Sequence, residues 1–522
     1  MPLNARCPRR PRSESKISDT PTGPYDVVIV GGGSAGVVLA RRLADDDPQR
    51  TVCLIEAGPA FEHDPRVLRL EQSLALVGDP AYDYDYPIVP QMRGNSRVRM
   101  SRARMLGGCS SHNDSWALRA PDADMDRWSA LGAEGWDAAG TGAYFDRVFA
   151  EMRVHPVAQE AGLSRAWVAA ANEAGFPTID TTTGEFGDGI AWISLNEHDG
   201  TRVSTAVAYL YPLSDLPANL TLLLETRATR IRIEAGRTQA VETDRGVIHA
   251  AGEIVVSSGA IDTPKLLMLS GIGPADHLRA HDIPVIADLR GVGSNLTDHI
   301  ETPVIWESAR DPGPSMNGLE LGMYAALGGE PEPNVQFTVG HFTYWLDAEP
   351  FSELPRPPRA FCFAPNVARP ASRGTVRLAS ADPSDTPLID PGYFTDPAGR
   401  DERLLVEGVR LARRLAATDA LQDWIVREVA PGPELQSDAE LGGYVRHYSN
   451  TVYHPSATCR MGAPDDPAAV VDARLRVRGI EGLRIADASV FPELVRVNPN
   501  MTVVMLGAKA ADLIAEDLPA GR

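Results

Sequence analysis

The sequence predicts an α/β protein: a Rossmann-like dinucleotide-binding domain interleaved with a second, α+β domain built on an antiparallel sheet. Residues 25–56 carry a strand, a glycine triplet, a helix, a second strand and an acidic residue, in that order. Residues 247–267 repeat the passage from an apolar strand through a glycine into a helix. From about residue 312 onwards, prolines separate short alternating segments, a pattern that is typical of antiparallel strands.

The first of these segments has the features of a nucleotide-binding βαβ unit. Five of the six residues in 25–30 are apolar and four are β-branched, which predicts a buried parallel strand. Gly31, Gly33 and Gly36 match G-x-G-x-x-G, whose glycines permit a tight turn, close approach to a pyrophosphate and close helix packing. Glu56 follows twenty residues after Gly36, where a carboxylate binds the hydroxyls of an adenosine ribose. An ordinary glycine-rich turn would leave the position of Glu56 unexplained.

The other elements follow from local composition. The sequence predicts helices over 37–44, 161–174, 403–416 and 503–515, and strands over 51–55, 221–233, 247–257, 335–339, 375–378 and 483–486. It also predicts a hairpin around Gly236, a helix after Gly259 with Pro264 in its first turn, a turn over 271–274 and an irregular loop over 449–462.

The amino-acid composition limits which binding partners and which cellular compartment are expected. The 522 residues are 43% hydrophobic, enough for more than one core, and the net charge of -20 argues against nucleic acid as a partner. No apolar run approaches the ~20 residues of a membrane span. The five cysteines are scattered and fit neither a disulfide framework nor a metal site, so we expect a cytoplasmic protein without a metal. Residues 1–24 are polar and rich in proline and arginine, and are expected to form a disordered tail.

A basic stretch leads into a glycine loop in the first third of the chain. Arg97, Arg99, Arg102 and Arg104 precede Gly-Gly-Cys-Ser-Ser at 107–111. Glycines with hydroxyl residues form a nest of backbone donors that suits an anionic or electron-rich ligand. A solvated basic turn is the alternative interpretation.

Four motifs together resemble the glucose–methanol–choline (GMC) family of FAD-dependent alcohol oxidoreductases. They are Gly107–Asn113, Ser258–Pro264, Tyr453–Pro455 and Asn498–Asn500, and the likeness extends over residues 25–513. The resemblance implies the GMC fold, with FAD-binding segments interleaved with a substrate domain. After a tail over 1–24, it implies an FAD-binding domain made of the segments 25–158, 222–311 and 450–518. The implied substrate domain is made of the segments 159–221 and 312–449.

The resemblance also implies which residues bind FAD and carry out the chemistry. The residues expected at FAD are Gly31, Gly33, Ser34, Ala35, Gly36, Glu56, Ala57, Arg104, Leu106, Gly107, Gly108, Ser111, Asn113, Ala228, Ser258, Gly259, Asp487, Ala488, Asn498, Asn500 and Thr502. Hydride passes from the alcohol carbon to flavin N5, and His454 and Asn498 match the two catalytic positions of the family. Either a free base or a cation that stabilises the alkoxide is consistent with a histidine at 454. Asn498 is expected to donate to the substrate oxygen or, alternatively, only to shape the turn before Pro499. Ser101 is a weaker candidate near the flavin, as is Asn113.

Substrate recognition is expected at Glu301, Tyr453 and His454. Glu301 matches the glutamate that binds a quaternary ammonium in the choline-oxidising branch of the family; a structural ion pair is the alternative role. The histidine that links flavin covalently in that branch falls at Met100, so we predict non-covalent FAD.

The aromatic cage of the choline-oxidising branch is incomplete in this sequence. Its positions fall at Ser73, Leu319 and Thr338, although Phe342, Tyr344 and Trp345 lie close enough in sequence to fill some of the gap. We therefore expect a primary alcohol other than choline to be favoured, with an amine that pairs with Glu301.

Several alternatives stay open. The electron acceptor is oxygen, or a quinone or other acceptor if the enzyme is a dehydrogenase. A redox-silent lyase or a non-enzymatic flavoprotein on the same fold would keep FAD without alcohol oxidation. An NAD enzyme fits the first unit but not the later motifs. The resemblance weakly favours a homodimer.

Overall fold

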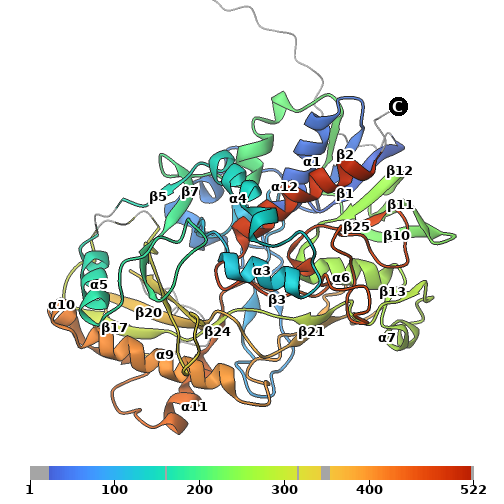
Figure 1. Cartoon of the computed structure of the whole chain (residues 1–522). Coiled ribbons are helices and arrows are strands. Elements are labelled where there is room, and N and C mark those ends of the chain that lie inside the picture. The colour runs from blue at the N-terminus through green and yellow to red at the C-terminus, as the bar shows by residue number, and fades with distance from the viewer. Residues whose placement is uncertain (1–22, 159–160, 314, 316, 342–352, 519–522) are drawn as a thin grey trace, which may run out of the picture.

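The computed structural model describes residues 23–158, 161–313, 315, 317–341 and 353–518 (Figure 1). Two large sheets organise these residues, one of seven strands and one of eight. The predicted tail lies outside the described residues except for its last two positions. Among the described residues, no helix is long and apolar enough to cross a bilayer.

The seven-stranded sheet has a parallel core that confirms the predicted βαβ unit. Its parallel strands lie in the order β25 (Leu483–Ile485), β12 (Gly246–Val256), β1 (Tyr25–Val30), β2 (Val52–Ile55) and β9 (Leu220–Leu223). The apolar residues of β1 are buried because strands pair on both sides and helices cover the sheet. Helices α1 (Ser34–Asp46) and α12 (Asn500–Asp517) lie side by side next to β1 and β2 (Figure 1). A Cβ on Gly507 would lie 2.7 Å from the Ala35 carbonyl oxygen, so glycine lets the two helices pack closely.

The single strand predicted over 221–233 is wrong, because the segment contains two. Strand β9 ends at Leu223 at one edge of the sheet, and β10 (Ala228–Glu234) lies at the other edge. Between them, Glu225 has a φ of +50°, which interrupts the extended backbone. The predicted hairpin at Gly236 is confirmed, since β10 pairs antiparallel with β11 (Arg237–Thr243).

The position of Pro264 in helix α6 (Gly259–Leu269) differs from the prediction. The helix begins at Gly259, so Pro264 lies in its second turn and not its first. A proline there leaves the Ala260 carbonyl without its helical N–H partner. The Thr458 hydroxyl donates to that carbonyl at 2.7 Å, which explains why the helix tolerates the proline. The turn predicted over 271–274 contains a short strand, β13 (Ile272–Gly273), paired with β14 (Ala287–Asp288).

The eight-stranded sheet is antiparallel throughout. Its main order is β23 (Ile425–Ala430), β17 (Val304–Ser308), β20 (Ala360–Val367), β19 (Val335–Gly340), β18 (Leu321–Ala325) and β6 (Gly189–Trp192); β16 (Ile300–Glu301) pairs with both β20 and β24 (Asn450–Thr451). Helix α9 (Arg400–Ala416) packs on β20, with α5 (Gly162–Glu173) and α11 (Asp438–Tyr448) beside it (Figure 1). The sheet includes β16 and β17, which precede the domain boundary predicted between 311 and 312. The division into domains remains a prediction.

Several shorter elements lie outside the two large sheets. They are helices α2 (Pro65–Leu68), α3 (Asp122–Ala130), α4 (Ala138–Glu151), α7 (Ala275–Ala280) and α10 (Asp419–Gln422), the 3₁₀ turns η2 (Gly108–Ser111) and η6 (Ala488–Val490), and strands β3 (Tyr86–Pro87), β4 (Arg99–Met100), β5 (Val154–Pro156), β7 (Ser194–His198), β8 (Thr201–Arg202), β15 (Ser294–Leu296), β21 (Gly374–Arg377) and β22 (Leu388–Asp390).

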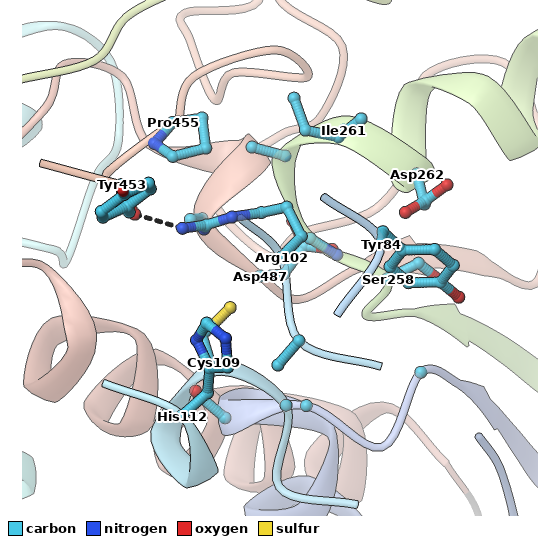
Figure 2. A pocket seen from close by; sticks show the side chains of 18 of the residues that line it. Tyr84, Arg102, Cys109, His112, Ser258, Ile261, Asp262, Tyr453, Pro455 and Asp487 are labelled. Carbon is cyan, nitrogen blue, oxygen red and sulfur yellow. Dashed lines mark hydrogen bonds between the residues drawn. The ribbon is translucent and has the colours of Figure 1, made fainter. Parts of the chain in front are cut away.

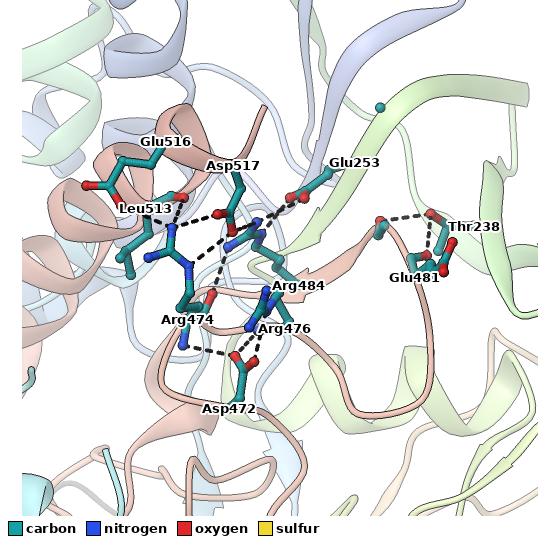
Figure 3. Close-up of polar contacts among 12 residues, drawn as sticks. Thr238, Glu253, Asp472, Arg474, Arg476, Glu481, Arg484, Leu513, Glu516 and Asp517 are labelled. Carbon is teal, nitrogen blue, oxygen red and sulfur yellow. Dashed lines mark hydrogen bonds and ion pairs between the residues drawn. The ribbon is translucent and has the colours of Figure 1, made fainter. Parts of the chain in front are cut away.

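A cluster of ion pairs ties the end of α12 to the parallel sheet (Figure 3). The Arg484 side chain on β25 is almost fully buried and donates to Glu253 at 2.6 Å and to Asp517 at 2.7 Å. Arg474 donates to Asp517 at 2.8 Å and to Glu516 at 3.1 Å. These contacts hold the far end of the helix whose first residue, Asn500, borders the main cavity.

Candidate active site

A cavity of about 870 Å³ lies between the two sheets. One end is formed by the carboxyl ends of β1 and β12 and the start of α1, where ligands bind in open α/β sheets. The other end is formed by β16, β19 and the loops that contain His454 and Asn498. Figure 2 shows some of the lining, with Arg102 between Tyr453 and Ser258, and with His112 and Cys109 below it.

The glycines at the first end form a backbone cradle that is open to the cavity. Gly31 has a φ of +107°, and a Cβ there would lie 2.4 Å from the Ser257 carbonyl oxygen. A Cβ on Gly33 would meet no protein atom closer than 3.8 Å, so protein packing does not explain the glycine at this position. The start of α1 has no side-chain cap, so its first N–H groups are free to bind an anion. This geometry fits the phosphates of FAD.

Glu56 lines the same end of the cavity with a buried carboxylate. Its Oε2 accepts from the Gly32 N–H and its Oε1 from the Gly58 N–H, each at 2.8 Å. Burial raises the pKa of Glu56 to about 7, although these backbone hydrogen bonds oppose the shift. The backbone bonds fix the direction of the carboxylate, which still has acceptor capacity for a ribose diol.

The predicted nest forms the 3₁₀ turn η2. Gly107 and Gly108 have φ values of +85° and +52°, and a Cβ on Gly108 would lie 2.7 Å from the Gly33 Cα. Glycine therefore brings this loop against the start of α1. The Ser111 hydroxyl turns away from the cavity and donates to the Leu106 carbonyl at 2.9 Å.

His454 is held by two buried residues of the neighbouring segment. Its Nδ1 lies 2.8 Å from Nδ1 of His299, and its backbone N–H donates to Asp298 at 2.8 Å. The other ring nitrogen of His299, Nε2, lies 2.9 Å from the Ala368 carbonyl oxygen. Burial lowers the pKa of His299 to about 4 and holds the pKa of His454 well below its usual range, with His299 and Arg102 adding to the second shift.

A short ladder fixes the two segments that carry these residues. Ile300 pairs with Thr451 and Glu301 with Asn450, and the ladder continues as the Val452 N–H donates to the His299 carbonyl at 3.0 Å. The histidine pair and Glu301 therefore share one backbone register.

Glu301 and its neighbours form the wall beside His454. Glu301 is 3% exposed and lines the cavity with Leu319, Thr338 and Tyr453. Tyr453 has a φ of +63°, and burial raises the pKa of its hydroxyl to about 12. Two of the three aligned cage positions, Leu319 and Thr338, are thus non-aromatic members of this wall. The side chain of Ser73, and Phe342, Tyr344 and Trp345, lie outside the described residues.

Asn498 also lines the cavity. Its Oδ1 accepts from Gln336 Nε2 at 2.9 Å. Two residues later, Asn500 Oδ1 accepts from the Ser34 hydroxyl at 3.0 Å, which joins the last helix to the glycine cradle. Asp487 accepts from the Gly259 N–H at 2.9 Å and the Thr263 hydroxyl at 2.6 Å, and burial nevertheless raises its pKa.

Most of the predicted site residues line this one cavity. They are Gly31, Gly33, Ser34, Ala35, Glu56, Ala57, Gly108, Asn113, Ala228, Ser258, Gly259, Glu301, Tyr453, His454, Asp487, Ala488, Asn498 and Asn500. Gly36, Leu106, Gly107, Ser111 and Thr502 lie behind the lining, as do Met100 and Ser101, which are both buried. The Arg104 side chain donates to the Pro80 and Ala81 carbonyls outside the cavity.

Sequence reasoning missed several lining residues. Arg102, which donates to the Tyr453 carbonyl, lies in the basic stretch whose next arginine, Arg104, was expected at FAD (Figure 2). Trp116 contributes an aromatic surface and donates to the Leu319 carbonyl at 2.8 Å. The signal for Arg102 was the cluster of arginines before the nest, but only the fold shows which of them faces inward.

Comparisons with known proteins agree with this arrangement. Residues 25–301 and 370–507 match the two GMC oxidoreductase family models. The chain is 42% identical to choline oxidase of Arthrobacter globiformis, with 94% of each chain covered, and 37% identical to mouse (Mus musculus) mitochondrial choline dehydrogenase, with 94% of this chain and 89% of the relative covered. The crystal structure of pyridoxine 4-oxidase from Mesorbium loti is similar at a TM-score of 0.85 and 30% identity, and the match covers 94% of this chain and 99% of that one. The chain therefore belongs to the GMC oxidoreductase family of FAD-dependent enzymes that act on alcohol-type substrates.

Proposed function

We propose that the protein oxidises a primary alcohol that carries an amine, with non-covalent FAD at the glycine cradle and His454 as the base. When bound, FAD supplies the hydride acceptor at N5. The observation that carries the proposal is the chain of contacts from Ala368 through His299 to His454.

The chain of contacts supports one tautomer of His454, in which Nε2 is the base. A carbonyl oxygen only accepts, so Nε2 of His299 carries a proton and donates to Ala368. Since burial keeps His299 neutral, its Nδ1 is an acceptor. Nδ1 of His454 must then donate to it, which leaves Nε2 of His454 as the unprotonated nitrogen. The low pKa of His454 favours this neutral form. We therefore favour the free base over the cation for removal of the hydroxyl proton.

Asn498 supplies the complementary group. With its Oδ1 bonded to Gln336, its NH₂ group is available to donate to an alcohol oxygen as that oxygen loses its proton. An amide does this without competing for the proton.

Glu301 is proposed to select a cationic substrate. Glu301 lines the cavity and is 3% exposed, so water screens little of the attraction between its carboxylate and a cation that enters the cavity. Each lost cation–π contact costs about 0.5 to 2 kcal/mol, so the loss of two aromatic contacts at the cage positions reduces choline affinity by about 1 to 4 kcal/mol. Leu319 and Thr338 therefore favour an amino alcohol other than choline.

FAD is proposed to be held without a covalent link. Met100 stands where the linking histidine falls in the choline-oxidising branch, and its thioether is buried against the Thr451 hydroxyl. Acid precipitation of the purified protein should release all of the flavin into the supernatant. Flavin that stays with the protein pellet would contradict the non-covalent assignment.

The first experiment is anaerobic titration of the flavin absorption band with choline, 2-aminoethanol, benzyl alcohol and a sugar alcohol. Bleaching by an amino alcohol supports the proposal. Bleaching by choline at low concentration contradicts the inference that the incomplete aromatic cage disfavours choline. A band that no alcohol bleaches favours the lyase or the non-enzymatic flavoprotein. Readmitting air tests oxygen against an alternative acceptor such as a quinone.

We also propose a reducing compartment, such as the cytoplasm, and a homodimer. Cys53, Cys109, Cys362 and Cys459 are free thiols in the described structure, and three of them are buried. The homodimer rests on the family likeness alone.

A further inference from the structure

Gln336 is a buried polar residue that lies directly behind Asn498. Its side chain extends from β19, is 1% exposed, and donates through Nε2 to Oδ1 of Asn498 at 2.9 Å. We propose that Gln336 is a positioning residue that fixes the direction of the Asn498 amide, so that the NH₂ group faces the cavity. This inference rests on the proposed donor role of Asn498.

The strand register places Gln336 on the cavity side of its sheet. Thr338, two residues further along β19, lines the cavity, and residues two apart in a strand face the same side. Gln336 is paired with Tyr324 on one side and with Asn366 on the other, and Asn366 is paired with Glu301. A row of polar side chains therefore crosses the sheet from the proposed cation site to the residue behind Asn498.

Packing alone does not account for a glutamine at this position. Gln336 Oε1, the Tyr324 hydroxyl and both amide atoms of Asn366 are buried and have no hydrogen-bond partner among the described residues. A buried polar atom without a partner is destabilising, and an apolar side chain on the strand would avoid that cost. In the described structure, the side chain of Gln336 makes one hydrogen bond, the one to Asn498.

The direction of the Asn498 amide decides what the cavity offers to the substrate oxygen. An amide has an acceptor oxygen on one side and a donor NH₂ group on the other. With the oxygen held by Gln336, the donor side faces an oxygen that gains negative charge. The reversed amide would present its own oxygen and would repel that charge.

The Gln336→Glu variant tests this inference because glutamate has the same shape but only accepts when ionised. It should attract the Asn498 NH₂ group and turn Oδ1 towards the cavity. The probe is acetate, an acceptor-only anion, whose binding to the holoenzyme is followed by perturbation of the flavin absorption band. Loss of one hydrogen bond to a charged group predicts that the acetate Kd rises about tenfold or more. The rate constant of flavin reduction by the best alcohol should fall by a similar factor with little change in KM.

A double-mutant cycle separates orientation from charge and from folding. In an Asn498→Ala background, Gln336→Glu should change the acetate Kd and the reduction rate less than about twofold, since no amide remains to turn. Asn366→Asp is the matched control, because it adds a charge one strand away without a contact to Asn498. Gln336→Met, which frees the amide without adding charge, should show a smaller loss that also disappears in the Asn498→Ala background. Flavin content and Tm report folding for every variant.

Two results would overturn the inference. One is an equal effect of Gln336→Glu in both backgrounds, which would mean that charge or packing is responsible. The other is no effect of either variant on acetate binding or reduction. If no alcohol reduces the flavin but acetate binding still shows the coupling, then the proposed alcohol oxidation fails while the positioning role stands. If the wild type is reduced but the cycle shows no coupling, then only the positioning role fails.

Discussion

The imidazole rings of His299 and His454 meet through their Nδ1 atoms at 2.8 Å, with the ring planes at 83° to each other. His299 is completely buried, and its Nε2 lies 2.9 Å from the Ala368 carbonyl oxygen, which favours a proton on that nitrogen. The base proposed for the reaction thus takes its tautomer from a residue that does not line the cavity.

His299→Leu should therefore slow the chemical step. Without the acceptor at Nδ1, His454 is free to adopt the tautomer that protonates Nε2, and a general base contributes about 10²- to 10⁴-fold to a reaction. We expect the rate constant of anaerobic flavin reduction to fall about 10- to 100-fold, on the assumption that some of this contribution is lost. His281→Gln is the control, because His281 does not line the cavity. Equal rates in wild type and His299→Leu would refute the tautomer assignment.

Stability should depend on pH through the same residue. The pKa of His299 is about 4 in the folded protein, against about 6.5 for an unperturbed histidine, so the unfolded chain binds the proton more tightly. Stability is then lost as pH falls from about 6.5 towards 4, by about 2 kcal/mol at pH 5. Thermal scans at pH 7 and pH 5 should show a smaller fall in Tm for His299→Leu than for the wild type. The same fall in both proteins would contradict the prediction.

Glu56→Gln should weaken retention of FAD. Each carboxylate oxygen of Glu56 accepts a hydrogen bond from a backbone N–H group. In Glu56→Gln, the side-chain NH₂ group would face one of these two N–H groups. Replacing the charged acceptor for a ribose hydroxyl costs about 1.5 to 3 kcal/mol of binding free energy, which predicts an FAD affinity about 10- to 150-fold lower. Flavin fluorescence after dilution measures the release. Glu71→Gln provides a surface control, and unchanged release from Glu56→Gln would exclude Glu56 from the cofactor site.

Glu301→Gln should lower kcat/KM for amino alcohols more than kcat/KM for neutral alcohols. Removing the carboxylate should lower kcat/KM for an amino alcohol about 10- to 100-fold, as expected for the loss of a charged hydrogen bond. Neutral alcohols of the same length should be affected much less. A uniform loss over both classes would favour the alternative, a structural role for Glu301.

Arg484→Met should destabilise the fold without changing the chemistry. Arg484 is buried and bonded to Glu253 and Asp517, and breaking a buried pair costs about 3 to 5 kcal/mol, less where the partners reach solvent. We expect a Tm several degrees lower, with the reduction rate of the folded protein unchanged. The matched control is Arg476→Met, since Arg476 pairs with Asp472 at the surface (Figure 3) and such pairs contribute about 0 to 1 kcal/mol. Equal Tm losses would contradict this distinction.

Local pattern was sufficient to predict the nucleotide-binding unit. β1, the glycines, α1, β2 and Glu56 follow one another within 32 residues, and each has a signal of its own. The break between β9 and β10 was not visible, because residues 221–233 contain neither glycine nor proline, and the positive φ there falls at Glu225. The place of Pro264 was also hidden, because its compensating partner, Thr458, is almost 200 residues away.

The supporting residues of the site could not be predicted for a similar reason. His299 stands in Asp298–Glu301, a polar run from which only Glu301 was selected, and nothing local indicates that its ring meets His454. Gln336 lies in a strand whose inward face is defined only by its pairing with Tyr324 and Asn366. Residues that contact the substrate are indicated by motifs, whereas the residues behind them become visible only through long-range pairing.

The short ladder between β16 and β24 limits the length of substrate that fits the proposed site. Glu301 stands on one strand and His454 follows the other, and the backbone bonds of the ladder fix how far apart they are. A substrate that places its amine at the carboxylate has its hydroxyl carbon presented to the base only if the spacer between them matches that distance. The ladder therefore fixes the distance that the substrate must span. A homologous series of amino alcohols should show one optimal chain length.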